Sequence, residues 1–173
     1  MMAHSMRNMA AVHGVPVATW ITAVGVVGAD VLSKTLVTDD LAGSRVRILW
    51  GVIVLELTRN GGAAFSVGQR YTAFIALVAI CAVYGIIRFS RKSSSKLFSI
   101  SLGLILGGAT GNLIDRLARA PGVFDGHVVD WIHIAFLPFV FNLADAAITI
   151  GAVLLVLTLL NGGRELAPLE PED

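Results

Sequence analysis

Four apolar stretches, each close to the length needed to cross a lipid bilayer, constrain this chain more than any other feature. They cover about residues 15–37, 71–87, 97–114 and 136–160. A helix needs about 20 predominantly apolar residues to span the hydrocarbon core. The chain is 55% hydrophobic and only 14% charged, whereas a soluble domain is roughly a quarter charged. We therefore predict a single polytopic membrane domain over residues 1–173, all-α, with four transmembrane helices.

The first apolar stretch has one alternative interpretation, a cleaved secretory signal. Arg7 precedes it, as a basic residue precedes the apolar region of such a signal. However, no small-x-small cleavage site follows the stretch, and Asp30 and Lys34 lie within it. These features favour a retained helix.

A compact basic segment separates the second and third stretches. Arg88–Lys96 contains four basic residues and no acidic residue. Short basic loops remain in the cytoplasm, so we expect both termini to be cytoplasmic and the two longer connections to lie outside. The tail, residues 161–173, is acidic and contains proline, and we expect it to be solvated and flexible.

The connection between the first two stretches, residues 38–70, is more than a linker. Trp50–Thr58 is rich in β-branched and apolar residues, which predicts strands, and Asn60-Gly61-Gly62 predicts a tight turn. We therefore expect a small extracytoplasmic β-sheet, a cradle, between the first and second helices. In the later connection, His133–Phe139 is apolar and contains Pro138, so we place it at the membrane interface before the fourth helix.

The composition argues against several other classes of protein. The lone cysteine, Cys81, excludes an intramolecular disulfide and a multi-cysteine metal site. The four histidines lack metal-ligand spacing, and a net charge of +1 gives no reason to expect nucleic acid. Gly107-Gly108-Ala109-Thr110-Gly111 lacks the Lys-Ser/Thr ending of a phosphate loop. Gly103, Gly107 and Gly111 instead have the spacing that is typical of closely packed helices. We expect no metal and no cofactor.

Two carboxylates, Asp130 and Asp145, lie beside sequence that is as apolar as a membrane-spanning segment. A charge at membrane depth is costly and commonly has a function. Neighbouring like charges cannot both ionise cheaply, so such a pair shares a proton. A pair of this kind activates water without a metal or a nucleophilic side chain.

Polar side chains fall at helical spacing on the third and fourth stretches. They are Asn112, Asp115 and Arg116 on the third, and Asn142, Asp145 and Thr149 on the fourth. Lipid would not solvate them, so we expect the two stripes to face each other. For the asparagines and the arginine, a purely structural network is an equally good interpretation. Asp30 and Lys34, at i and i+4, form either an internal ion pair or a brace for the site; a lysine general base is also possible, but no serine partner is evident.

Five motifs, in order along the chain, resemble those of the bacterial lipoprotein signal peptidase (signal peptidase II, or prolipoprotein signal peptidase) family. The resemblance covers the chain from the first helix to the end of the fourth. The motifs are Asp30-x-x-x-Lys34, Asn60-Gly61-Gly62-Ala63-Ala64-Phe65, Gly107-Gly108-Ala109-x-Gly111-Asn112-Leu113-Ile114-Asp115-Arg116, Val128-Val129-Asp130-Trp131 and Phe141-Asn142-Leu143-Ala144-Asp145. The sequence departs from the family pattern at Val31, Gly61 and Trp131 and in a longer stretch before Asp130, and both aspartates are retained.

The resemblance implies an intramembrane aspartic endopeptidase that removes signal peptides from diacylglyceryl-modified prolipoproteins, cutting just before the lipidated cysteine. It implies a bacterial inner-membrane location, with the active site near the outer face. Asp130 and Asp145 would be catalytic. The residues expected to line the site are Asn60, Gly62, Asn112, Arg116 and Asn142. The residues expected to support it are Asp30, Lys34, Asp115 and Phe65.

Two other functions remain open on the residues alone. A small proton-coupled transporter would also use intramembrane carboxylates, although it would spread them across membrane depth and usually needs more helices. A non-catalytic assembly protein would tolerate Asp-to-Asn changes. We expect lipid-modified prolipoproteins and membrane lipids as partners, no nucleic acid, and a monomer.

Overall fold

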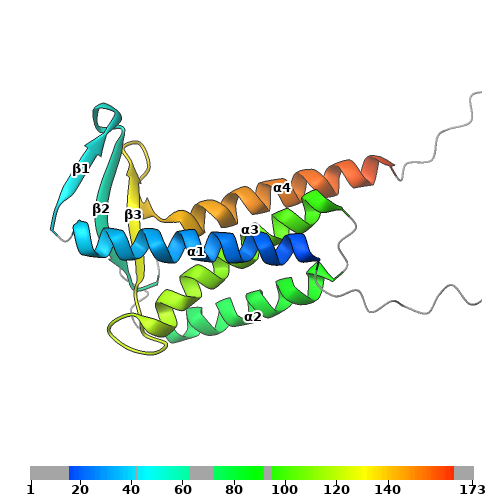
Figure 1. Ribbon diagram of the computed structural model, residues 1–173, viewed down its shortest axis with the longest axis horizontal. Coiled ribbons are helices and arrows are strands. Elements are labelled where there is room, and N and C mark those ends of the chain that lie inside the picture. The colour runs from blue at the N-terminus through cyan, green and yellow to red at the C-terminus, as the bar shows by residue number, and fades with distance from the viewer. Residues whose placement is uncertain (1–15, 42, 63–71, 92–94, 166–173) are drawn as a thin grey trace, which may run out of the picture.

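The four apolar stretches form four long helices that run alongside one another, with a small sheet at one end (Figure 1). The computed structural model describes residues 16–41, 43–62, 72–91 and 95–165. The helices are α1 (Val17–Asp40), α2 (Thr72–Ser90), α3 (Lys96–Ala118) and α4 (Leu143–Glu165). Each contains a segment long and apolar enough to cross a membrane, which confirms the predicted fold class. Residues 166–173 of the expected flexible tail lie outside the described residues.

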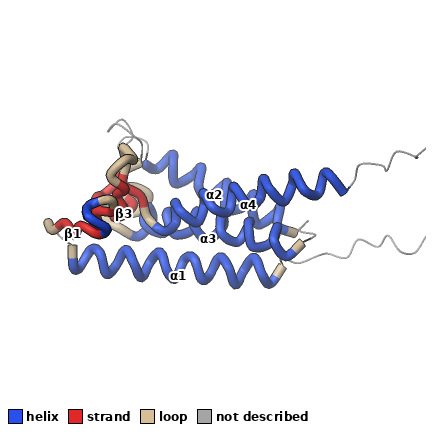
Figure 2. The backbone as a smooth tube through the Cα atoms, turned by 90° about the horizontal axis from the view of Figure 1, so that it is seen from above, coloured by secondary structure: helices blue, strands red, loops and turns tan. Residues whose placement is uncertain are grey.

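Helix α3 is the central helix of the bundle. It packs against α1, α2 and α4, and 56% of its most apolar window is buried, compared with 11% for α2 and α4. Seen from above, the helices extend away from the sheet in one direction (Figure 2). The outer helices therefore leave most of their apolar surface for lipid, while α3 carries the packing.

Small residues on α3 allow its neighbours to approach closely, as the glycine spacing predicts. A Cβ atom on Gly108 would fall against the carbonyl oxygen of Ala144 and the side chain of Ile148 on α4. Without a hydrophobic driving force between helices in lipid, this close backbone approach is a main source of attraction. By contrast, a Cβ on Gly85 of α2 would meet no atom within 4 Å.

These two glycines give a matched test of the packing. Gly108→Ala is expected to lower the free energy of unfolding by about 1–3 kcal/mol, because the α3–α4 backbones must separate. Gly85→Ala is expected to leave it unchanged or raise it by up to about 1 kcal/mol, because alanine is the better helix former. Thermal unfolding in detergent measures both, and equal shifts would contradict close packing at Gly108.

The sheet has four antiparallel strands in the order β1-β2-β3-β4. They are β1 (Arg45–Ile48), β2 (Ile53–Asn60), β3 (Val128–Ile134) and β4 (Val140–Phe141), with a short 3-10 turn, η2 (Leu49–Gly51), between the first two. In the Asn60-Gly61-Gly62 segment, where a turn was expected, Gly62 has a φ of +114°, a conformation that favours glycine.

Two sequence predictions about this region need correction. The sheet was expected between the first and second helices alone, but β3 and β4 come from the connection between α3 and α4. The fourth helix was expected from residue 136, but α4 begins at Leu143 and continues to Glu165. Residues 136–142 are mostly apolar, and for that reason they were assigned to the helix. Pro138 lacks the N–H that a helix interior requires, and the segment instead forms a turn and the short strand β4.

Candidate active site

The start of α4 places Asp145 by a reciprocal pair of hydrogen bonds. Asn142 precedes the helix, and its Oδ1 accepts from the backbone N–H of Asp145 at 3.0 Å. In return, Asp145 Oδ2 accepts from the backbone N–H of Asn142 at 3.2 Å. This is a capping box, in which the residue before the helix and the third helical residue satisfy each other's backbone donors. Asn142 is therefore the cap of α4, and the carboxylate is fixed at the sheet end of the helix.

Strand β3 places Asp130 at the junction between the sheet and the helices. Asp130 is only 2% exposed and pairs across the ladder with Thr58 of β2. The register shifts between Leu55 and Thr58, where β2 contains one more residue than β3. Such bulges change the direction in which the following side chains point. Beyond the bulge, Asn60 lies diagonally across the ladder from Asp130, and its Nδ2 donates to Asp130 Oδ2 at 3.0 Å.

Side-chain amides connect the two carboxylates. Asn142 Nδ2 donates to Asp130 Oδ1 at 2.6 Å and to Asn112 Oδ1 at 3.1 Å. Asn112 Nδ2 donates to Asp145 Oδ1 at 2.8 Å. Each of the four carboxylate oxygens therefore accepts at least one N–H. Because an ionised carboxylate can accept about four hydrogen bonds, each group retains capacity for a water or a substrate.

Lys34 anchors the network from α1. Its Nζ lies 2.7 Å from Asp30 Oδ2 and 2.8 Å from Asp115 Oδ2, and it donates to Asn112 Oδ1 at 3.0 Å. The buried ammonium thus has two carboxylates as ion-pair partners and one amide oxygen as a hydrogen-bond acceptor, which offset the cost of burying its charge. With Oδ1 of Asn112 held by the lysine, its Nδ2 must point at Asp145. Together with Asn142, which donates to the same oxygen, Lys34 therefore fixes the orientation of an amide that contacts a carboxylate of the pair.

Asp115 ties α3 to β3. Its Oδ2 accepts from the backbone N–H of Val129 at 3.2 Å, and its Oδ1 pairs with Arg119. Val129 immediately precedes Asp130, so this contact holds the part of β3 that carries the Asp130 carboxylate. Asp30 has a similar role on the other side, since its Oδ1 accepts from the backbone N–H of Ala144 at 3.0 Å.

The electrostatic environment distinguishes Asp130. Burial raises the pKa of Asp130 to about 6, and the neighbouring charge of Asp145 acts in the same direction. The amide donors of Asn60 and Asn142 oppose this shift because they favour the charged form. Asp130 can therefore hold a proton at a pH at which an ordinary aspartate has lost it.

The structure brings most of the predicted site residues together. Asn60, Asn112, Asn142, Asp130 and Asp145 form one continuous network. Gly62 belongs to its edge, because its backbone N–H donates to Asn60 Oδ1 at 3.0 Å. Phe65 lies outside the described residues.

Two arginines lie near the C-terminal end of α3, beside this network. Arg116 donates to the backbone carbonyl of Asn112 at 3.1 Å and leaves its Nε without a partner. The arginine that pairs with Asp115 is Arg119, which the sequence did not lead us to expect. The i, i+4 spacing of Asp115 and Arg119 is the signal that would have identified this pair.

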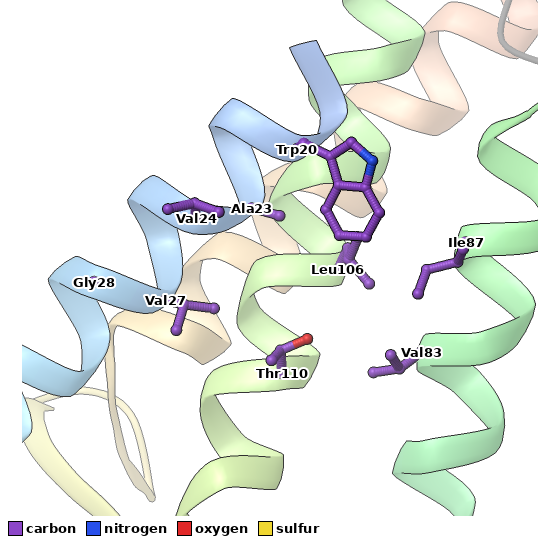
Figure 3. Close-up of a pocket in the computed structure, with 9 residues that line it drawn as sticks. All are labelled: Trp20, Ala23, Val24, Val27, Gly28, Val83, Ile87, Leu106 and Thr110. Carbon is purple, nitrogen blue, oxygen red and sulfur yellow. The ribbon is translucent and has the colours of Figure 1, made fainter. Parts of the chain in front are cut away.

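Cavities border the helices, and two of them differ in their relation to the carboxylates. One, of about 330 Å³, has Asp145 in its wall. The other, of about 520 Å³, lies among α1, α2 and α3, with Trp20, Val83 and Leu106 around it (Figure 3). None of the residues around the second cavity belongs to α4 or to the sheet, so its size does not connect it with the carboxylates. Among the residues that the structure describes, no three His, Cys, Asp or Glu side chains are grouped to hold a metal ion.

Comparison with known proteins identifies the family. The family described as "Signal peptidase (SPase) II" matches residues 22–161. The chain belongs to the signal peptidase II family. It is thus a peptidase of a bacterial membrane family, as the five motifs predict, and the expectation of a multi-pass membrane protein agrees with the four apolar helices.

Individual relatives agree with this assignment. A lipoprotein signal peptidase of Rhodococcus jostii is 43% identical over 148 residues, which are 85% of this chain and 71% of that protein. One of Mycolicibacterium smegmatis is 47% identical over 128 residues, 73% of this chain and 54% of that protein. A solved structure of a bacterial membrane enzyme has a TM-score of 0.75 at 26% identity and covers 89% of this chain and 94% of its own.

Proposed function

We propose that this protein is an aspartic endopeptidase that removes signal peptides from diacylglyceryl-modified prolipoproteins, cutting just before the lipidated cysteine. The observation that carries the proposal is the pairing of Asp130 and Asp145 through Asn142, which donates to both carboxylates. Membership of the signal peptidase II family supports a peptidase that acts on lipoproteins. The two carboxylates supply the chemistry.

In the proposed reaction, one proton is shared between the two carboxylates. Asp145 accepts a proton from a bound water, which attacks the scissile carbonyl. Asp130, whose pKa burial raises to about 6, polarises the carbonyl oxygen when it holds the shared proton and later protonates the leaving amine. Asn60, Asn112 and Asn142 hold the carboxylates in place throughout, so little reorganisation is needed when charge moves.

Arg116 is proposed to contact the substrate backbone. Its guanidinium uses only one described acceptor, the carbonyl of Asn112, and its Nε has none. An extended peptide at membrane depth lacks partners for its own carbonyl groups. Arg116 is thus suited to bind one of them.

We propose that the sheet end of the bundle faces outward from the bacterial cytoplasmic membrane. Arg88, Arg91 and Lys96 lie at the ends of α2 and α3 that point away from the sheet (Figure 1). Basic segments remain cytoplasmic. Both termini would then be cytoplasmic, and the carboxylates would lie near the outer surface, where a lipidated cysteine is anchored.

Cleavage of matched substrates tests the function. The purified protein in detergent is expected to cut a prolipoprotein that carries a diacylglyceryl group on its cysteine, with the cut immediately before that residue. The same polypeptide with an unmodified cysteine is expected to remain intact. Mass spectrometry of the products locates the cut. A protein that cuts neither substrate, but moves protons across a vesicle membrane, would instead support the transporter.

The pH dependence of turnover tests the role of Asp130. We expect kcat/KM to decline as pH rises above about 6, because Asp130 then loses the proton that the reaction needs. Asn60 donates to the carboxylate and so lowers its pKa. Asn60→Ala removes that donor, which raises the pKa of Asp130 and moves the decline to higher pH. A shift to lower pH, or none, would contradict this role.

A further inference from the structure

The apolar cavity beside Asp145 has no role in the proposed reaction. Its floor is the face of α4 that carries Ala146, Thr149 and Ile150, and its roof includes Phe139 and Phe141. The rings of Phe139 and Phe141 pack edge to face, with centroids 6.4 Å apart. The Thr149 hydroxyl donates to the Asp145 backbone carbonyl at 2.9 Å. The wall is therefore apolar except for the Asp145 carboxylate at one end.

Beyond this cavity, exposed apolar side chains continue along α4 as a track that carries Ile150, Val153 and Leu157. A separate cavity, of about 280 Å³, lies further along the same helix and includes Val153 and Leu157. Ile150, Val153 and Leu157 follow at intervals of three and four residues, so they share one face of α4. Ile150 and Val153 are each 54% exposed and Leu157 is 49% exposed. This face meets whatever surrounds the bundle, and the length and apolarity of α4 place it in lipid.

The length of the track matches one leaflet of a bilayer. From Asp145 to Leu157 the helix rises about 18 Å, at about 1.5 Å per residue. Half of a hydrocarbon core of about 30 Å is about 15 Å. A peptide side chain would need only the part beside Asp145. An acyl chain, which begins near the headgroups and reaches the midplane, would occupy the whole track.

We propose that this track binds one acyl chain of the diacylglyceryl group on the substrate cysteine. The inference rests on the proposed function. The lipidated cysteine supplies the leaving amine, and its thioether-linked glyceryl group begins a few covalent bonds from the scissile carbonyl. A chain that starts beside Asp145 and descends along Ile150 and Val153 therefore helps to place the scissile bond at the carboxylates. The cavity among α1, α2 and α3 has none of these connections, because it contains no residue that contacts either carboxylate.

A bulky residue in the far part of the track provides the test. Val153→Trp obstructs the track about one turn beyond the Thr149–Ile150 segment and leaves the carboxylates untouched. Val78→Trp is the matched control, since Val78 is 50% exposed on α2 and lines none of the cavities described above. Each variant and the wild type are assayed with two lipopeptides of identical sequence, one bearing a dipalmitoylglyceryl cysteine and the other a dioctanoylglyceryl cysteine.

Val153→Trp is expected to lower kcat/KM for the dipalmitoyl substrate at least about tenfold, because a filled apolar site rejects the long chain. The dioctanoyl substrate, whose chains end before the obstruction, is expected to be cut at close to the wild-type rate, which also shows that the variant is folded. Val78→Trp should leave both rates unchanged. Equal losses for both substrates, or no loss for either, would overturn the acyl-chain assignment. If the wild type cut neither lipopeptide, the proposed function itself would fail.

Discussion

Asp130→Asn and Asp145→Asn are each expected to lower kcat/KM by about a thousandfold or more, because general acid and base catalysis contribute about 10²–10⁴ each. An amide can neither accept the proton of water nor protonate the leaving amine. Each substitution is nearly isosteric and turns one accepting oxygen into a donor that faces another N–H. We therefore expect it to cost about 1 kcal/mol of stability. Cleavage of the diacylglyceryl substrate and thermal unfolding in detergent measure the two effects.

Asp125→Asn is the matched control for these variants. Asp125 lies in the same connection as Asp130 but is exposed, and its backbone N–H bonds to the Gly122 carbonyl. Its substitution is expected to change neither turnover nor stability. If either Asp130→Asn or Asp145→Asn were folded and cut at close to the wild-type rate, that residue would not be catalytic. Tolerance of both changes would favour the assembly protein.

Lys34→Met is expected to lower the free energy of unfolding by about 3–5 kcal/mol, the range for breaking a buried ion pair by removing one partner. The loss leaves Asp30 buried with no cation, while Asp115 keeps Arg119. Lys96→Met removes an exposed lysine at the start of α3 and is expected to change stability by less than about 0.5 kcal/mol. Thermal unfolding in detergent compares the two variants.

A double substitution distinguishes two effects of Lys34, which are the balance of buried charge and the orientation of the Asn112 amide. Lys34→Met combined with Asp30→Asn removes both charges and is expected to be more stable than Lys34→Met alone. It should nevertheless remain slow in cleavage, because Asn112 has lost one of the two donors that orient its amide toward Asp145. Full recovery of kcat/KM in a stable double variant would show that Lys34 has only a structural role.

The sequence predicted the candidate site better than it predicted the local fold. Asp130 and Asp145 were selected because carboxylates beside membrane-grade apolar sequence are costly, and the asparagines because polar side chains avoid lipid. Arg119 was missed because its i, i+4 relation to Asp115 was not weighed. The start of α4 was misplaced because residues 136–142 are apolar in either a helix or an interfacial turn. Only the capping box of Asn142 and Asp145 marks the boundary.

The sequence by itself determined that the chain crosses a membrane four times as helices, because a backbone in lipid must satisfy its hydrogen bonds within each segment. It also supplied the residue types of the site. The tertiary structure decided which of them meet. Asn60 reaches Asp130 across 70 residues and Lys34 reaches Asn112 across 78. Those contacts depend on strand register, on the bulge in β2 and on close packing around α3, and none of these is a property of one segment alone.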